Sequence, residues 1–486
     1  MHNRIYKALF ILLLFSFLSE GVFAQNISWS PVHKLSKKTG AVEIIGKSNQ
    51  GYLIHIFGSK EHFIALYDVN MKQEWIKPLI LEGKSVRLEE IILPKDTMIM
   101  IYSTVGEDYI RSYYARKLSF DGRPSKPVKI GELDVDSRQV DPRMRVKLSK
   151  DRTKILCYLK RPNEKPENTR TLLCHVFTTN LQRIGEKEIR IPFKKSTWRI
   201  ENFVLDNNGN SYFLIRYRNT KLKKSNPFRK QFFLYEYLIE QDITNNYDLN
   251  LGEKYVSSVK LNIDNLNKKV SVGGFYSDNS FYSITGTFNL CVDLETSKLL
   301  PLAYQKIDSA FLVKLVAERI SAHNGEINDF TIKDMVLRDD GGIILIAESE
   351  YEINKPYNAP NVYNTYTTNT ITYYHYNDIL IFSINPDGSV HWNKVVKKRQ
   401  VSRENDGYYT SYSLSIRRDR IFLIFNDDIS RNNNVVQYSI SNKGEINVRN
   451  LFKDIIATGL SMQLGEDEIL IPSIYRSNLR LVKLQY

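Results

Sequence analysis

Apolar and polar positions alternate in short runs along most of the chain, a pattern that favours half-buried β-strands over helices. The clearest example is Asp378–Lys398, where the apolar run Ile379–Ile384 is followed by the sequence NPDG at Asn385–Gly388. A second alternating run containing Trp392 comes next. Because Pro-Asp-Gly between two such runs is a turn signal, this stretch predicts a β-hairpin.

Weaker copies of this hairpin recur, and each ends in a polar or aromatic return strand. The copies are Phe63–Leu79, Tyr113–Ile130, Cys174–Pro192, Phe233–Leu261, Asn289–Ile307, Asp378–Lys398 and Val435–Phe452. Each copy follows another predicted hairpin whose turn is rich in Gly, Asn or Asp. The repeating unit therefore has four strands and a period of roughly 45–60 residues, which is typical of a β-propeller blade.

The two ends of the chain predict how the array closes. The last unit, Leu460–Tyr486, supplies three strands, and the segment Ile27–Leu35 supplies a single strand near the other end. Pairing the two would complete one blade and remove the sheet edges that an open array exposes. We therefore expect an all-β propeller of eight four-stranded blades in one domain, 25–486. Seven blades is the alternative, because the Phe233–Leu261 copy is distorted.

One segment departs from the strand pattern. Asp308 and Ser309 can cap the sequence AFLVKLVAERIS that follows, whose apolar residues 311, 312, 315, 316 and 320 share one helical face. This pattern predicts one short helix inserted between two blades.

Residues 1–24 have the pattern of a signal peptide. Arg4 and Lys7 precede the apolar run Ala8–Leu18, and small residues before Gln25 form a cleavage site after Ala24. The apolar run is shorter than the roughly 20 residues of a membrane span, and no second apolar span follows. We therefore expect an exported chain without a transmembrane segment after cleavage, located in the periplasm, on the cell surface or in the medium.

The net charge of the chain changes the expected class of partner. The formal charge is +14, and since residues 1–24 contribute +1, the mature chain carries +13. After export, this charge indicates acidic proteins, anionic glycans or lipid surfaces rather than nucleic acid, unless it is simply spread over the surface for solubility.

The longest segments between predicted strands should lie on one face of the propeller, because strand direction alternates. Of these, Arg216–Lys230 is rich in basic residues and Tyr351–Asn377 is rich in Tyr, and together they suit a binding surface. A solvated loop and a long hairpin, respectively, are the alternatives. The candidate binding residues are Arg216, Arg218, Lys221, Lys223, Lys224, Arg229, Lys230, Tyr351, Tyr357, Tyr363, Tyr366, Tyr373, Tyr374 and Tyr376. The segment Asp242–Gly252 is an exception, a long connection expected on the opposite face.

Catalytic and metal signatures are absent from the sequence. It contains no HExxH, GxSxG, P-loop or GxGxxG motif, so no catalytic residue, metal or cofactor is predicted. His55 and His62 lie on two arms of one predicted hairpin, where a structural pair is favoured over a metal site. The three Cys are too few for a disulfide framework, but Cys157 and Cys174 are predicted to face each other across a hairpin, as a bridge or as buried thiols.

Carboxylates on the expected binding face are the other group of chemical interest. A glycosidase would need two of them opposed. The candidates are Asp134, Asp136, Asp141, Glu404 and Asp406, which the sequence alone cannot pair.

The segments 373–400 and 405–412 resemble a recurrent pattern in uncharacterised exported β-propeller-like proteins of the Bacteroidetes. The resemblance implies a signal peptide and a propeller, and it implies no activity. We therefore expect a non-enzymatic binding or scaffold protein with a protein or glycan partner in the cell envelope or outside the cell. A carbohydrate-active enzyme, a glycoside hydrolase or lyase on a propeller, is the alternative, and a structural subunit of an envelope assembly is a third reading.

Overall fold

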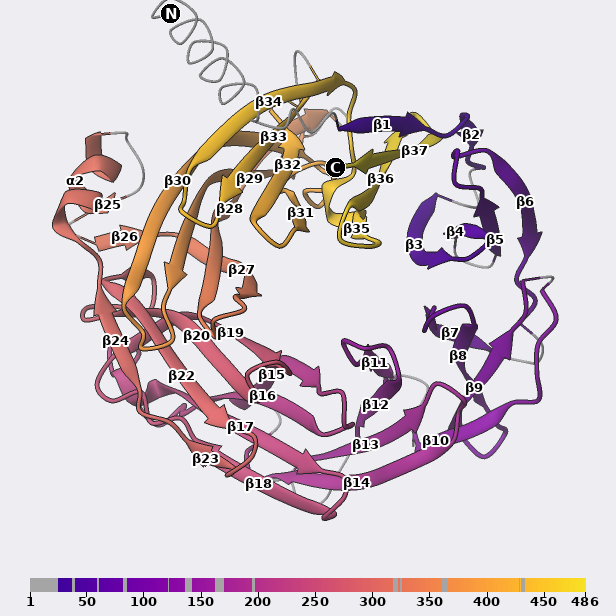
Figure 1. Ribbon diagram of the computed structural model, residues 1–486, viewed down its shortest axis with the longest axis horizontal. Coiled ribbons are helices and arrows are strands. Elements are labelled where there is room, and N and C mark those ends of the chain that lie inside the picture. The colour runs from indigo at the N-terminus through magenta and orange to yellow at the C-terminus, as the bar shows by residue number, and fades with distance from the viewer. Residues whose placement is uncertain are drawn as a thin grey trace, which may run out of the picture.

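Eight antiparallel sheets form a closed ring in the computed structural model, each sheet being one blade (Figure 1). This confirms the expected β-propeller and its eight blades. The structure describes residues 25–36, 40–58, 61–81, 85–120, 122–135, 142–161, 170–194, 197–317, 322–323, 326–360, 366–427, 429 and 433–486. The predicted signal peptide lies outside these residues.

The first four blades follow the chain order from the inside of the ring to its outside. Blade 1 comprises β3 (Ala41–Ser48), β4 (Gly51–Phe57), β5 (His62–Tyr67) and β6 (Gln73–Pro78), and blade 2 comprises β7 (Arg87–Ile92), β8 (Met98–Val105), β9 (Ile110–Leu118) and β10 (Val128–Asp134). Blade 3 comprises β11 (Arg145–Leu148), β12 (Lys154–Lys160), β13 (Arg170–Thr178) and β14 (Arg183–Ile191). Blade 4 comprises β15 (Trp198–Leu205), β16 (Ser211–Arg218), β17 (Lys230–Leu238) and β18 (Ile243–Asp248).

Blades 5 to 8 repeat this order and end with the chain's own beginning. Blade 5 comprises β19 (Tyr255–Asp264), β20 (Lys269–Ser277), β22 (Gly286–Asp293), β23 (Lys298–Leu299) and β24 (Ala303–Lys306), and blade 6 comprises β27 (Phe330–Leu337), β28 (Ile343–Pro360), β29 (Tyr366–Ile384) and β30 (Val390–Arg403). Blade 7 comprises β31 (Ser413–Ile416), β32 (Arg420–Asn426), β33 (Asn434–Ser441) and β34 (Ile446–Lys453). Blade 8 comprises β35 (Met462–Gln463), β36 (Glu468–Tyr475), β37 (Asn478–Gln485), β1 (Asn26–Trp29) and β2 (His33–Lys34).

The hydrophobic core is divided among the contacts between blades. Among the described residues, eight clusters of buried side chains lie one at each contact between neighbouring blades. This arrangement follows from the sequence, because a strand with apolar residues at successive positions buries both of its faces. In β12, for example, Cys157 packs towards blade 2 and Leu156 towards blade 4.

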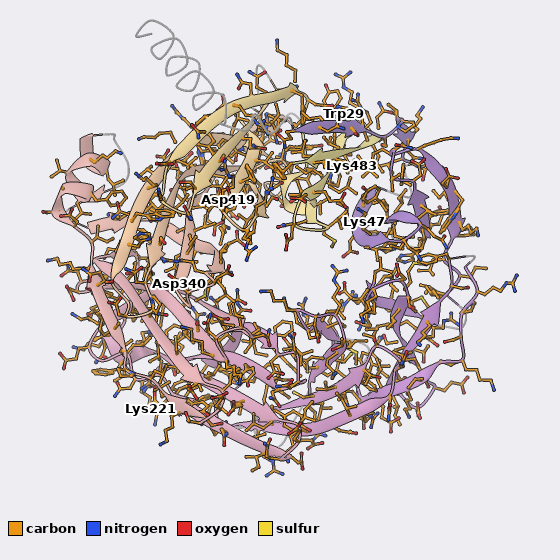
Figure 2. All side chains as sticks on the ribbon, viewed as in Figure 1. Trp29, Lys47, Lys221, Asp340, Asp419 and Lys483 are labelled. Atoms are coloured by element: carbon orange, nitrogen blue, oxygen red, sulfur yellow. The ribbon has the colours of Figure 1, made fainter. Side chains whose placement is uncertain are left out.

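The ring is closed by the two ends of the described chain, as the sequence predicts. β1 and β2 pair with β37 in antiparallel register, with Trp29 opposite Val482. Trp29 also packs edge-on against Phe452 of blade 7 at 4.8 Å between ring centroids. Blades 8 and 1 are joined by an ion pair of 2.8 Å between Lys47 and Glu468. Figure 2 shows Trp29, Lys47 and Lys483 in this part of the ring.

The expected helix and turn are present. The helix α2 (Ser309–Ala317) begins after Asp308, whose carboxylate accepts a hydrogen bond from the backbone N–H of Ala310. Phe311 and Leu315 bury the helix face against blades 5 and 6. Three short strands lie beside it: β21 (Ser283–Ile284), β25 (Ala322–His323) and β26 (Glu326–Asn328). In the NPDG turn, Gly388 adopts φ = 87°, which glycine allows without strain.

Two expectations about blade 3 and blade 4 are wrong. Cys157 pairs with His175, whereas Cys174 pairs with Tyr158, so the register differs by one residue from the predicted one. Since successive side chains point to opposite faces, the two thiols lie on opposite sides of the sheet and both are free. In blade 4, most of Asp242–Gly252 is the outer strand β18, so the long connection expected on the opposite face does not exist.

Candidate functional site

The connections of the propeller fall on two faces. Connections between the second and third strands of a blade, and those between one blade and the next, share one face because all blade strands are antiparallel. We call it the long-connection face. It carries the 3-10 helix η2 (Pro227–Arg229) in blade 4 and a projecting part of blade 6, so both candidate segments share this face, as predicted.

The Tyr-rich segment is an extension of blade 6. β28 and β29 continue their pairing to Pro360 and Tyr366, and β30 continues beside them to Arg403. The segment is therefore a long hairpin, the structural alternative that the sequence left open. A bulge between Glu348 and Glu350 marks the base of this hairpin, and bulges of this kind re-aim the strand beyond them.

Strand alternation divides the predicted Tyr residues between the two faces of the hairpin. Tyr351 is opposite His375, and Tyr373 lies on the same face, with its ring near the Lys355 ammonium. Tyr374 and Tyr376 are on the other face. Tyr363 lies outside the described residues, and Tyr366 is placed at the start of β29 by its backbone.

The first of these faces presents an exposed aromatic and apolar surface, which we call the hairpin patch. Its members are Tyr351, Ile353, Tyr357, Tyr373, His375 and Val401. Tyr351, Tyr357, Ile353 and Val401 are 42%, 44%, 36% and 38% exposed. Tyr351 stacks on His375, with 4.6 Å between the ring centroids. Burial lowers the pKa of His375, and the charges of Lys355 and Arg399 lower it further. The patch continues the face of blade 6 that packs against blade 5 nearer the base.

The opposite face of the hairpin is occupied by internal contacts. Tyr374 donates a hydrogen bond of 2.9 Å to Asp406, and this bond raises the pKa of Tyr374 to about 12. The ring of Tyr376 lies beneath the ammonium groups of Lys333 and Lys398. Tyr374 therefore braces the hairpin against the connection from blade 6 to blade 7, whereas Tyr376 packs within blade 6.

A buried ion pair fixes the base of the hairpin. Glu348 and Lys398 have fully buried side chains 2.7 Å apart. Lys398 also donates to the carbonyl of Tyr376 at 2.9 Å and to the side chain of Gln400 at 2.7 Å. Glu348 accepts a further hydrogen bond of 2.6 Å from the Ser411 hydroxyl. Burial lowers the pKa of Lys398, and Glu348 opposes this change.

The basic residues of blade 4 separate into two groups. Lys221, Lys223 and Lys224 are exposed, and Figure 2 shows Lys221 at the outer rim of the ring. Among the described residues, these three ammonium groups have no acidic partner within ion-pair distance. Arg218, at the end of β16, is also exposed. The three lysines are available for long-range attraction of an anionic partner.

The second group of basic residues supports the connection from inside. Arg216 pairs with Glu201 at 2.9 Å, and Arg229 donates to the carbonyl of Leu222. Lys230 lies 4.3 Å from the ring centre of Phe281 in blade 5, and burial lowers its pKa to about 8, aided by the charge of Arg216. These residues are structural rather than available to a partner.

Blade 5 lies between the two candidate segments in ring order. Its connection carries Phe281 under Lys230, and the adjacent Tyr282 is 79% exposed. Tyr255 of the same blade donates a hydrogen bond to the carbonyl of Ser225. The basic connection, Tyr282 and the hairpin patch therefore occupy consecutive blades of one face.

Sequence reasoning missed four participants: Tyr282, Ile353, His375 and Val401. A usable signal existed for the last three, because the odd positions of 351–357, 369–375 and 399–403 share a face once the segment is read as strands. Residue composition alone could not separate Tyr373 from Tyr374.

The carboxylates predicted on this face do not form an opposed pair in the part of the chain that is described. Glu404 accepts a hydrogen bond from the backbone of Thr372, and Asp406 accepts one from Tyr374. Asp134 ends β10, whereas Asp136 and Asp141 lie outside the described residues.

Three carboxylates, Glu43, Glu89 and Glu90, interact on the inner strands β3 and β7. Burial, together with the charges of Glu43 and Glu89, raises the pKa of Glu90 to about 7 against the opposing effect of Arg145. A raised pKa is what a general acid needs, so the carbohydrate-active alternative would assign that role to Glu90.

The His pair is present as predicted, with 3.0 Å between Nε2 of His55 and Nδ1 of His62. Burial and the neighbouring His55 lower the pKa of His62. Among the described residues, no group of three or more His, Cys, Asp or Glu side chains could hold a metal ion. No helix in this part of the chain has the length and apolar character to cross a membrane.

Comparisons with known proteins yield distant structural matches. No protein-family model matches the chain, and no curated protein matches it. Among solved structures, the WD40 domain of SCAP from fission yeast aligns with 94% of this chain and 98% of its own, at 9% identity and a TM-score of 0.38. Sqt1 of Chaetomium thermophilum bound to the N-terminus of ribosomal protein L10 aligns with 93% and 98%, at 10% identity and a TM-score of 0.38. The β-propeller domain of the Trilobed protease from Pyrococcus furiosus aligns with 88% and 98%, at 9% identity and a TM-score of 0.34.

Proposed function

We propose that this chain is an exported, non-enzymatic β-propeller scaffold that binds an acidic protein or an anionic glycan through its long-connection face. The partner would lie in the cell envelope or outside the cell. The observation that carries the proposal is the hairpin patch, in which aromatic and apolar side chains are exposed together on one face of a projecting hairpin. Side chains of this kind dominate contact energy in binding surfaces.

The geometry of the hairpin supports a recognition role. The buried Glu348–Lys398 pair and the Tyr374–Asp406 hydrogen bond hold the strands in place before a partner arrives. A surface that is already ordered loses little conformational entropy on binding, which favours affinity. Tyr rings and aliphatic side chains would supply contact area to the face of a sugar or to an apolar side chain of a protein.

The exposed lysines of blade 4 would act earlier, during encounter. Charged groups on a surface raise association rates with partners of opposite charge, and salt weakens this effect.

The targeting pattern of residues 1–24 supports an exported location, where acidic proteins and anionic glycans are the available partners. Export is checked by mass spectrometry of the secreted or envelope-associated chain, which should begin at Gln25; a chain that retained residues 1–24 would contradict it.

The binding test uses immobilised dextran sulfate and poly-glutamate, with neutral dextran as reference. The triple variant K221Q/K223Q/K224Q should associate about 3–10 times more slowly at low salt and lose most of the salt dependence of the rate. The double variant Y351A/Y357A should instead dissociate faster, by about tenfold, because it removes contact area.

Tyr475→Ala is the control for the aromatic variants, since its ring is 51% exposed on blade 8 and lies outside the hairpin patch. Surface plasmon resonance at low and physiological salt measures both rates. Unchanged kinetics in both test variants, or equal effects of Tyr475→Ala and Y351A/Y357A, would place the working surface elsewhere.

A further inference from the structure

A second basic site lies in the middle of the ring, separate from the long-connection face. A cavity of about 450 Å³ is lined by the inner strands of four consecutive blades, β11, β15, β19 and β27. These strands border the centre of the ring in Figure 1. The lining residues lie mostly at the ends of these strands that lead into the short turns, so the cavity is nearer the face opposite the long connections.

Four lysines line this cavity, at positions 147, 150, 260 and 333. Lys333 is neutralised, because it pairs with Glu350 and lies near the Tyr376 ring. Among the described residues, Lys147, Lys150 and Lys260 have no acidic partner within ion-pair distance. The walls of the cavity also desolvate Lys147, which lowers its pKa although its side chain reaches solvent.

The other polar groups of the cavity are already committed to the fold. Asn202 donates to the carbonyl of Leu261 at 3.0 Å, and Asn262 donates to the carbonyl of Met335 at 2.9 Å. The one carboxylate in the lining, Asp334, accepts a hydrogen bond of 2.7 Å from Tyr412. The lysines are therefore the groups left to bind a ligand.

We propose that this cavity binds a small multivalent oxyanion, a phosphate or sulfate group that is either free or esterified to a small sugar. Three lysines without acidic partners give one polar cavity a net positive charge, which attracts an anion. Lysines bind such oxyanions as point charges with several donors. The volume lies within the range of small-molecule sites, which leaves room for a sugar unit beside the anionic group. This site does not depend on partner binding at the hairpin patch.

The test is isothermal titration calorimetry and thermal unfolding of the full chain with sodium pyrophosphate, at ionic strength matched with sodium chloride. Wild-type protein should bind with one-site stoichiometry, and its unfolding temperature should rise with pyrophosphate concentration, as linkage requires. The variant K147Q/K150Q/K260Q should lose affinity at least tenfold. In chloride alone, its unfolding temperature should be close to that of wild type, because the three lysines make no ion pair with a described residue.

The matched control is K221Q/K223Q/K224Q, which removes the same charge from the outer rim. It should keep wild-type affinity for pyrophosphate. If K147Q/K150Q/K260Q fails to fold, the single variant K147Q, which changes a solvent-exposed side chain, takes its place. Its affinity for pyrophosphate should fall at least threefold. Absence of binding to wild type, or an equal loss in both triple variants, would overturn the proposal.

Glucose 1-phosphate and inorganic phosphate separate the two sources of the anion. Tighter binding of the sugar phosphate would identify an ester as the ligand, and equal binding would identify the free ion. Wild-type protein that binds pyrophosphate but neither dextran sulfate nor poly-glutamate would contradict the proposed function and leave this site in place, so the two proposals fail independently.

Discussion

Glu90 is the residue whose protonation should couple most directly to the stability of the ring. It lies on the inner strand β7, and burial with the charges of Glu43 and Glu89 raises its pKa from 4.5 to about 7, while Arg145 opposes the change. Between these two values the unfolded chain releases the proton and the folded chain keeps it. The stabilisation is therefore complete below about pH 4.5 and is lost as pH rises through 7.

Glu90→Gln should remove this dependence. The variant's free energy of unfolding relative to wild type should be higher at pH 8 than at pH 4.5, by about 2–3 kcal/mol. Denaturant unfolding at the two pH values measures the difference. Glu466→Gln, at an exposed carboxylate, is the control and should show almost no change. A constant offset for Glu90→Gln at both pH values would show that the carboxyl group is not perturbed.

The hairpin of blade 6 is the element whose rigidity rests on one buried contact. Lys398→Met would leave Glu348 buried without its partner, and Glu348→Leu would leave Lys398 buried without its partner. Each single change should cost about 3–5 kcal/mol, because an unpaired charge remains inside the protein. The double variant should cost less than either single variant, since both charges are gone.

A double-mutant cycle by denaturant unfolding measures this coupling. The pair Lys129 and Glu132, which is exposed on β10, is the control and should give little coupling. Additive costs for the Glu348 and Lys398 variants would mean that the two side chains do not stabilise each other, and the hairpin base would then depend on the surrounding hydrogen bonds.

Elements also mark the boundary of what the sequence predicts. The strands, turns and helix α2 follow from local apolar periodicity and turn residues, so the propeller and its blade number could be predicted. The register between paired strands could not be predicted, because shifting one strand by one residue leaves its own alternation of apolar and polar positions unchanged. That is why Cys157 pairs with His175 rather than with Cys174.

The same limit applies to the candidate site. Both segments were predicted on the correct face from strand direction alone. Which Tyr rings are exposed depends on register within the hairpin, and it separates Tyr373 from Tyr374. The cavity lysines could not be identified from sequence, because Lys147 and Lys260 are brought together by inner strands of blades that are more than 100 residues apart.

At the scale of the whole molecule, stability depends on closing the ring. β1 and β2 cover the outer edge of β37, and Trp29 packs between Phe452 and the guanidinium group of Arg480. Without them, blade 8 would expose an open edge and the cluster between blades 7 and 8 would lose part of its cover. Deleting residues 25–36 should therefore cost several kcal/mol, a large share of the about 5–15 kcal/mol typical of folded proteins.

The closing contact can be tested in steps. Trp29→Ala should cost about 2–3 kcal/mol, because it removes a large, partly buried ring. Val32→Ala, at an exposed side chain between β1 and β2, should stay within about 0.5 kcal/mol of wild type. A synthetic peptide of residues 25–36 added to the truncated chain should raise its unfolding temperature with concentration, since the peptide binds the folded state alone. A truncated chain that unfolds at the wild-type temperature, with or without the peptide, would show that the ring is held by the blade contacts and that the terminal strands contribute nothing to its closure.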